Sequence, residues 1–384
     1  MKKIKSFLFA AVAIALTAPV FTSCGNDDSK EKIVEKIVEN MVSEYTYNDN
    51  MVAETKAKSG NKEAILLVAF GSTWNNAFLA FDKTVEAYKA AFQQADVYMS
   101  FSSDICINRA AIGENPDDND NIVSRQYYEP RYLLHAIGNA KYDKIYVQSL
   151  QVIPGEEFAA VLASVKKFMN NGYIASAHLD DEYLKQLEAN EAIRFGMPLL
   201  FDPEVDVPAV ATELSTLYAS EAQNGVVAFM GHGNPDNYDT FKANVRYTQL
   251  EDALQEINPK FYVGTVDMPD NYKHDVEARM KTDGFNNGKV YLHALMSIAG
   301  DHAHNDMAGG YDGKEGYWDE TVPTSEENSW FEYFNHTGYQ SVVPVVNGHP
   351  LGLLEIEGVR NIWIDHTKNA EFFEDAYHSM YPEE

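Results

Sequence analysis

Residues 289–310 read KVYLHALMSIAGDHAHNDMAGG, and this stretch indicates both the fold and the site. Residues 290–298 form a mainly apolar run that ends in a small turn at Ala299 and Gly300, which is typical of a buried strand. Side chains that can bind metals or carry protons follow the turn: Asp301, His302, His304, Asn305 and Asp306. Because ligands bind beyond the carboxyl ends of parallel strands, we expect a functional site here, with a solvated polar turn as the alternative.

The strand pattern of this stretch occurs twice in the chain. Residues 144–157, KIYVQSLQVIPGEE, align without gaps on residues 289–302, and residues 65–72, ILLVAFGS, align loosely on residues 225–232, GVVAFMGH. Apolar runs alternate with amphipathic segments in both halves, which predicts parallel strands joined by helices. We therefore expect an α/β fold of two similar lobes, each built on a parallel sheet.

The two lobes are expected at residues 62–200 and 201–384. The alignment places His302 opposite Glu157 and His232 opposite Ser72, so both histidines belong to the second lobe. The formal net charge of −28 argues against a nucleic-acid partner, because no basic surface is available to neutralise phosphates.

The N-terminus has the features of an export signal. Three lysines precede the apolar residues 7–20, which are too few to span a bilayer and end shortly before Cys24. With a cysteine at this point, the segment resembles a bacterial lipoprotein signal. Residues 1–24 are therefore predicted to be the signal peptide, and Cys24 is predicted to carry the lipid anchor. The alternative is an ordinary signal peptide. Residues 25–61 are charged and weakly periodic, which predicts a tether, and the protein is expected on the periplasmic side or the outer-membrane surface of the envelope.

Three metal-capable side chains, His232, Asp267 and His302, follow or close predicted strands at equal separations of 35 residues. A strand–helix–strand unit of roughly that length returns the chain to the same sheet edge, so the three can converge. Two imidazoles and a carboxylate suit a borderline divalent ion, and three protein ligands leave a position open for substrate. For each histidine alone, a capping or packing role is the alternative.

The strings LLVAFGST, QSLQVIPGEEF, GMPLL, FMGHG, VGTVDMPD and LHALMSIAGDHAHNDMA occur in this order and carry a family resemblance. The chain resembles the sirohydrochlorin cobaltochelatases of the anaerobic cobalamin pathway (the CbiK family), from about residue 64 to near the C-terminus. These enzymes are class II chelatases, as is ferrochelatase. The resemblance implies two Rossmann-like lobes with the active site in the cleft between them.

The resemblance also implies roles for single residues. His232 and His302 are expected to bind the metal and act in catalysis, and Asp267 completes the metal site where the family usually has glutamate. Gln151 stands where the family tends to have histidine, so no role is transferred to it. His304 is a further candidate ligand, with an exposed turn histidine as the alternative.

Metal insertion explains why such residues are needed together. The macrocycle loses two pyrrole protons as the metal enters, and a neutral histidine can accept a proton near physiological pH. Glu157 is expected to take or relay protons from the opposite lobe, although an acidic residue at a helix N-terminus is common. Backbone amides and hydroxyls at Ser72 and Thr73 are expected to bind a substrate carboxylate.

The sequence therefore predicts an exported chelatase that inserts a divalent metal into sirohydrochlorin or a related tetrapyrrole. Co²⁺ is the first candidate for the metal, and Fe²⁺ and Ni²⁺ are the others. No nucleotide cofactor is expected, and the oligomeric state stays open, a homo-oligomer included. The alternative is a non-catalytic surface lipoprotein that captures haem, a corrinoid or a metal, or that removes metal from haem. Export favours this alternative, whereas the presence of both histidines favours the enzyme.

Overall fold

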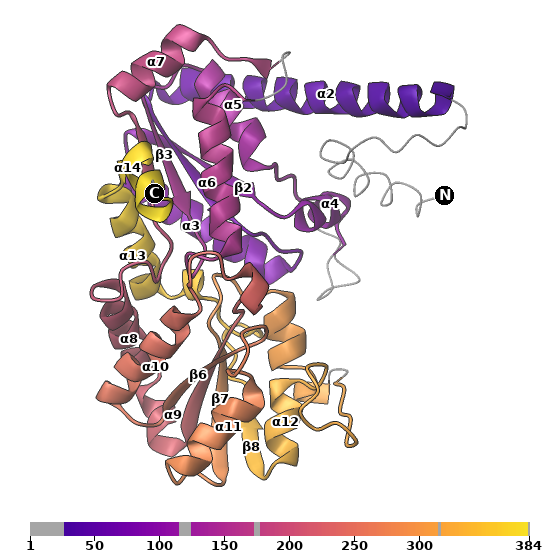
Figure 1. The fold of residues 1–384 in the computed structure, drawn as a ribbon, viewed down its shortest axis with the longest axis vertical. Coiled ribbons are helices and arrows are strands. Elements are labelled where there is room, and N and C mark those ends of the chain that lie inside the picture. The colour runs from indigo at the N-terminus through magenta and orange to yellow at the C-terminus, as the bar shows by residue number, and fades with distance from the viewer. Residues whose placement is uncertain (1–26, 115–123, 173–176, 314–315, 383–384) are drawn as a thin grey trace.

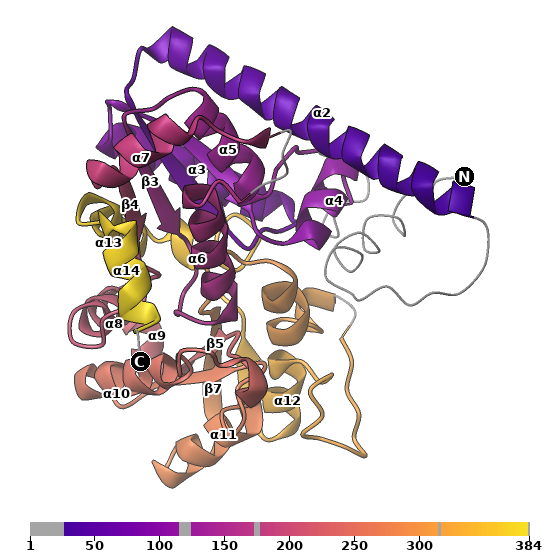
Figure 2. The same cartoon turned by 45° about the horizontal axis from the view of Figure 1, so that its top comes forward.

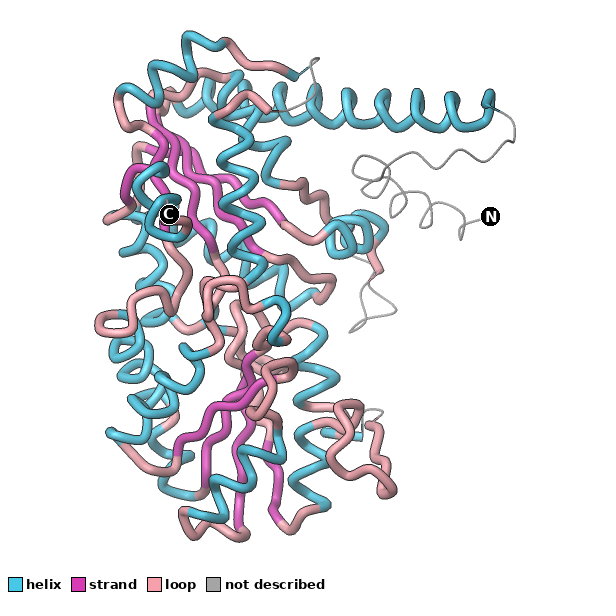
Figure 3. The backbone as a smooth tube through the Cα atoms, in the orientation of Figure 1, coloured by secondary structure: helices cyan, strands magenta, loops and turns pink. Residues whose placement is uncertain are grey.

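The computed structural model describes residues 27–114, 124–172, 177–313 and 316–382, with side chains from residue 40 onward. Two sheets lie one above the other along the long axis of the molecule, and helices cover their faces (Figures 1 and 3). Among the described residues, no helix combines the length and the apolar character that crossing a bilayer requires.

The first sheet has four parallel strands in the order β2-β1-β3-β4, with the short β9 antiparallel at its edge. The central strand β1 is almost continuously apolar and buried, as expected for a strand covered on both faces. The strands are β1 (Glu63–Ala69), β2 (Ala95–Phe101), β3 (Lys144–Ser149), β4 (Ile193–Gly196) and β9 (Glu371–Phe372).

The second sheet has four parallel strands in the order β6-β5-β7-β8. Its strands are β5 (Val226–Gly231), β6 (Phe261–Thr265), β7 (Gly288–Ala294) and β8 (Tyr339–Val342). The order repeats that of the first sheet, with β5 in the place of β1 and β7 in the place of β3, which are the pairs that align in sequence. The predicted α/β fold of two similar lobes with parallel sheets is confirmed.

Helices connect the strands and cover both sheets (Figure 2). Those of the first lobe are α3 (Asn75–Ala91), α4 (Asp104–Ile112), α5 (Pro130–Asn139), α6 (Glu156–Met169) and α7 (Asp181–Ala189). Those of the second lobe are α8 (Asp206–Leu217), α9 (Ala219–Asn224), α10 (Val245–Ile257), α11 (Lys273–Thr282) and α12 (Trp330–His336). The segment after β8 continues through α13 (Glu357–Lys368) and β9 to α14 (Phe373–Met380).

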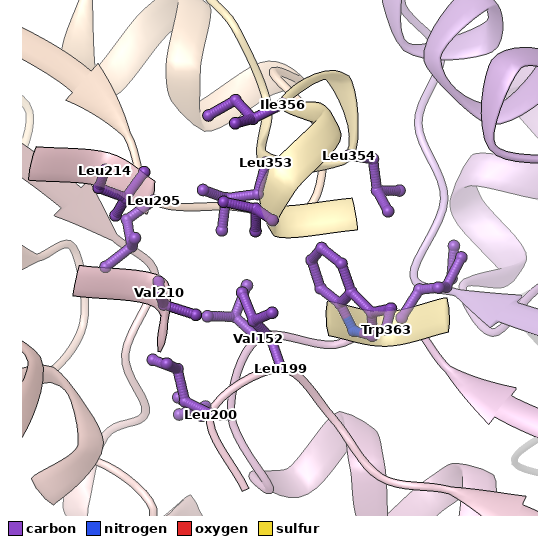
Figure 4. Close-up of a cluster of buried hydrophobic side chains, with 14 of the residues drawn as sticks. Val152, Leu199, Leu200, Val210, Leu214, Leu295, Leu353, Leu354, Ile356 and Trp363 are labelled. Carbon is purple, nitrogen blue, oxygen red and sulfur yellow. The ribbon is translucent and has the colours of Figure 1, made fainter. Parts of the chain in front are cut away.

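One apolar core among the described residues is shared by both lobes. It contains side chains from the loops after β3, β4 and β7, from α8, and from the segment 353–363 (Figure 4). Leu353 and Trp363 are completely buried at this junction. Burial of such side chains contributes about 1.5–3 kcal/mol each, so the lobes are joined by packing and not only by a linker.

The C-terminal segment corrects the predicted boundary between the lobes. Residues 201–384 were all assigned to the second lobe, but β9 pairs with β4, and the ring of Phe373 packs edge-on against Phe195 at 5.7 Å. Figure 1 shows α13 and α14, in yellow, beside the first lobe. The open edge of β4 and the apolar surface next to it are covered by a segment that returns from the far end of the chain.

The predicted tether at residues 25–61 also differs from the structure. Most of it forms one long helix, α2 (Asp27–Ser59), which reaches beyond the body of the molecule (Figures 1 and 2). Near its C-terminal half, Tyr45, Asn48 and Val52 are buried. Their spacing places them on one helix face, and Asp49 accepts a hydrogen bond from His135 of α5 at 3.0 Å. The predicted signal peptide, residues 1–24, lies outside the described residues.

Candidate active site

The carboxyl ends of the two sheets face each other, so the loops after the strands of one lobe touch those of the other. After β1, Asn76 donates a hydrogen bond to the carbonyl of Ala299, which follows β7, at 3.0 Å. After β3, the carbonyl of Leu150 accepts a hydrogen bond from the hydroxyl of Ser297. The strand ends of the two lobes therefore meet at one junction (Figure 3), where polar side chains that follow the strands can gather.

His232 stands directly after β5 and is half exposed. Its Nδ1 lies 2.7 Å from the carbonyl oxygen of Gly233. Because a carbonyl can only accept, Nδ1 carries the proton in this bond, and Nε2 of the neutral ring has a free lone pair. Gly233 has a positive φ of 79°, and a Cβ there would lie 2.7 Å from the amide of Met268, so the turn requires glycine.

Asp267 is brought next to His232 by the main chain. Its backbone amide donates to the carbonyl of His232 at 2.8 Å, and the amide of Val266 donates to the same oxygen at 3.0 Å. The carboxylate oxygen Oδ2 then lies 3.7 Å from Nε2 of His232. This distance is too long for a hydrogen bond, but it allows the imidazole and the carboxylate to bind the same metal ion.

His302 completes the group from the end of β7. It precedes a short π-helical turn (Ala303–Met307), and its ring lies 4.7 Å from the ring of His232, at 83° to it. Nδ1 of His302 makes a 2.6 Å hydrogen bond to Oδ2 of Asp306, one turn later. This bond raises the pKa of His302, although burial opposes the shift, and it leaves Nε2 for a ligand or a substrate proton.

The structure thus brings together the three residues that the sequence spacing singled out, His232, Asp267 and His302. Among the described residues, however, no three such side chains already stand in a metal-coordinating arrangement. All three are partly exposed, so an ion can enter and leave, and small side-chain rotations would be needed to bind it. An ion that is handed on to another molecule suits such an arrangement better than a structural metal does.

Asp306 was named only among the polar side chains after the turn, and the structure places its carboxylate against the ring of His302. Beyond it lies a cavity of about 60 Å³, lined by Thr265, Val266, Tyr272, Lys273, His274, Asp306, Thr324, Glu326 and Trp330. Lys273 is buried there and donates to the carbonyl of Ser325 at 2.7 Å, and burial lowers its pKa to about 8. The four-residue spacing from His302 to Asp306 on a helical turn was the signal that could have identified the pair.

The family of the chain follows from comparison with known proteins. Residues 63–371 match the family described as cobalt chelatase (CbiK). The chain belongs to the cobalt chelatase (CbiK) family. The protein is therefore a metal chelatase, and the resemblance predicted from the sequence is confirmed.

Individual relatives of this chelatase are distant but cover most of it. The chain is 26% identical over 313 residues to the sirohydrochlorin cobaltochelatase CbiKC of Nitratidesulfovibrio vulgaris, covering 80% of this chain and 90% of the relative. It is 23% identical to the sirohydrochlorin cobaltochelatase of Salmonella typhimurium, covering 80% and 96%. Among solved structures, SirB from Bacillus subtilis with Fe³⁺ matches with a TM-score of 0.46 and 15% identity, covering 83% and 98%.

The residues expected to bind substrate have different settings in the chelatase. Glu157 begins α6, where its Oε2 lies 3.5 Å from the hydroxyl of Ser102. Its side chain reaches solvent, but partial burial of the carboxyl group raises the pKa of Glu157. The charge of neighbouring Glu156 adds to this increase, and the hydrogen bond from the hydroxyl of Ser102 opposes it. A carboxyl group with a raised pKa can exchange protons nearer to neutral pH, which fits the predicted relay.

The expectation for Ser72 needs correction. Ser72 is 5% exposed, and its hydroxyl accepts a hydrogen bond from the amide of Trp74 at 3.2 Å, so it does not face a substrate. The sequence could not show this setting, because Ser72 lies next to Gly300 of the other lobe, which is distant in sequence. Thr73 is half-buried, and its role stays a prediction. His304 is buried against Trp74 and is not an exposed turn residue.

We expect Asp306→Asn to change the pH dependence of the chelatase. The hydrogen bond to Asp306 raises the pKa of His302, so its loss lowers that pKa and makes the neutral ring available at lower pH. The acidic limb of the pH–rate profile should move to lower pH, while the maximum rate falls roughly 10–100-fold because the ring loses its orientation. Asp301→Asn removes a nearby charge without that bond and should move the limb less. An unchanged profile in Asp306→Asn would contradict the assigned role.

Proposed function

We propose that this chelatase inserts Co²⁺ into sirohydrochlorin, with Fe²⁺ or Ni²⁺ as further substrates of the same donor set. The two relatives described above are sirohydrochlorin cobaltochelatases. The observation that carries the proposal is the grouping of two imidazoles and one carboxylate, the rings 4.7 Å apart, where the lobes meet. Imidazole and carboxylate ligands suit Co²⁺, and their partial exposure leaves room for a macrocycle.

The proposed mechanism gives both histidines the ion and only one of them the proton. Before insertion, His232, His302 and Asp267 hold the ion, and Asp306 orients the His302 ring. Insertion replaces two pyrrole protons by one divalent ion, so a base has to stand near the ring nitrogens. As the ion passes to the macrocycle, Nε2 of His232 is freed and takes a pyrrole proton, because the carbonyl of Gly233 keeps the other ring nitrogen protonated. Glu157, which belongs to the first lobe, receives or relays the second pyrrole proton.

Apolar side chains near the site support a flat substrate. Phe70, which follows β1, is 48% exposed, and Ile105 of α4 is 64% exposed. Cys106, the next residue of α4, packs near Gly71, and burial raises the pKa of its thiol, with the carboxylates of Asp301 and Glu157 raising that pKa further. Exposed aromatic and aliphatic groups beside convergent polar residues are typical of ligand sites, so we assign this face of the first lobe to the macrocycle.

The test mixes the purified protein with Co²⁺ and sirohydrochlorin and follows metallation by the visible spectrum. Metallation should be faster than without protein, and His232→Ala should lower the rate at least about 100-fold, the usual contribution of a positioned base. His378→Ala removes an exposed histidine of α14 and is the control. Metallation no faster than the uncatalysed reaction would contradict the proposal, and tight haem binding without turnover would favour the capture protein.

We also propose that the enzyme is exported and anchored to the envelope by a lipid on Cys24. The lysines and the apolar segment before this residue support the proposal. Cys24→Ser is expected to move the protein from the membrane fraction to the soluble fraction of cells, whereas Cys106→Ser should stay in the membrane fraction. A wild-type protein found unlipidated and soluble would contradict the anchor.

A further inference from the structure

The turn that carries His302 is held by the first lobe, although its sequence belongs to the second. We call residues 299–306 the His302 turn and residues 72–76, which run from the loop after β1 into the first turn of α3, the cradle. Trp74 of the cradle stacks on His304 of the turn, with ring centroids 3.6 Å apart and planes 3° from parallel. Both rings are almost completely buried, at 5% and 4% exposure.

Two further contacts fix the turn on the cradle. Asn76 donates a hydrogen bond to the carbonyl of Ala299 at 3.0 Å. Gly300 lies so close to Ser72 that a Cβ on the glycine would stand 3.2 Å from the serine oxygen and 3.1 Å from Ile298. The turn is therefore held at three successive points, two before His302 and one after it.

The other two site residues do not depend on the first lobe in this way. His232 and Asp267 are joined by main-chain hydrogen bonds between the ends of β5 and β6, within the second lobe. The distance between the rings of His232 and His302 is thus set partly by where the cradle holds the turn. A shift of the order of 1 Å in a reacting group can cost about 100-fold in rate.

We propose that Trp74 is a positioning residue, which sets the place of the His302 ring relative to His232 by stacking on His304. The inference rests on the proposed role of His302 and gives the cradle a task other than binding a substrate carboxylate. It also explains why Ser72 and Asn76 are buried at the end of a strand where the sequence predicted an open anion site. The competing interpretation is that Trp74 only fills the shared core.

The experiment compares Trp74→Leu, Trp74→Phe and the control Phe78→Leu. Phe78 is equally buried in α3 but stacks on Tyr127, away from the His302 turn. In Trp74→Leu we expect kcat for cobalt insertion to fall roughly tenfold, with KM for sirohydrochlorin nearly unchanged. Trp74→Phe keeps an aromatic face and should recover most of kcat, whereas Phe78→Leu should lower Tm without changing kcat.

A second variant, Gly300→Ala, tests the same role in case Trp74→Leu does not fold. Gly300→Ala keeps every side chain of the cradle but pushes the turn away from Ser72, so kcat should fall in the same direction as in Trp74→Leu. The visible absorption of Co²⁺ bound to the protein without macrocycle should change in both variants and stay as in wild type in Phe78→Leu.

Two outcomes overturn the inference. In the first, Trp74→Leu and Phe78→Leu lower Tm alike and keep wild-type kcat, so that Trp74 is only a core residue. In the second, the Co²⁺ spectrum is the same in wild type, Trp74→Leu and Gly300→Ala. The spectrum needs no sirohydrochlorin, so a failure of the proposed substrate is distinguishable from a failure of the positioning role.

Discussion

The structure depends on one constraint, which is that two parallel sheets present their carboxyl ends to each other across a shared apolar core. Parallel strands place chemically active loops at one edge only, and each lobe alone would expose that edge to water. Packing around Leu353 and Trp363 closes the junction and keeps the two edges opposed. The polar residues after each strand are therefore confined to a narrow region, where a flat molecule can meet groups from both lobes.

Within this region, hydrogen bonds to Nδ1 give the two histidines different properties. A backbone carbonyl holds His232 in one tautomer, and a carboxylate holds His302 and raises its pKa. A proton acceptor benefits from a defined lone pair, and a metal ligand benefits from a carboxylate behind it, which increases the basicity of the ring. The pattern fits a site where proton removal and metal transfer occur side by side.

The sequence predicted the parts of the fold that local pattern determines. The internal repeat predicted two similar lobes, each built on a parallel sheet, and the equal spacing of His232, Asp267 and His302 predicted that these residues can converge. Their proximity follows from strand ends, which apolar runs and glycine turns mark clearly. Their roles in catalysis stay predictions.

The parts that depend on contacts distant in sequence could not be predicted. Nothing local to β9 indicates that it returns to the edge of β4, and nothing local to Ser72 indicates that it lies next to Gly300 of the other lobe. The helix α2 was taken for a tether because its charged residues hide the face on which Tyr45 and Val52 are buried.

The most direct test of the account is a crystal structure of the protein with Co²⁺, in which anomalous scattering locates the ion. The account predicts one main peak at about 2.1 Å from Nε2 of both His232 and His302, with the carboxylate of Asp267 as the third protein ligand. An ion bound elsewhere, or bound to His302 without His232, would contradict the proposed site at the junction of the two lobes.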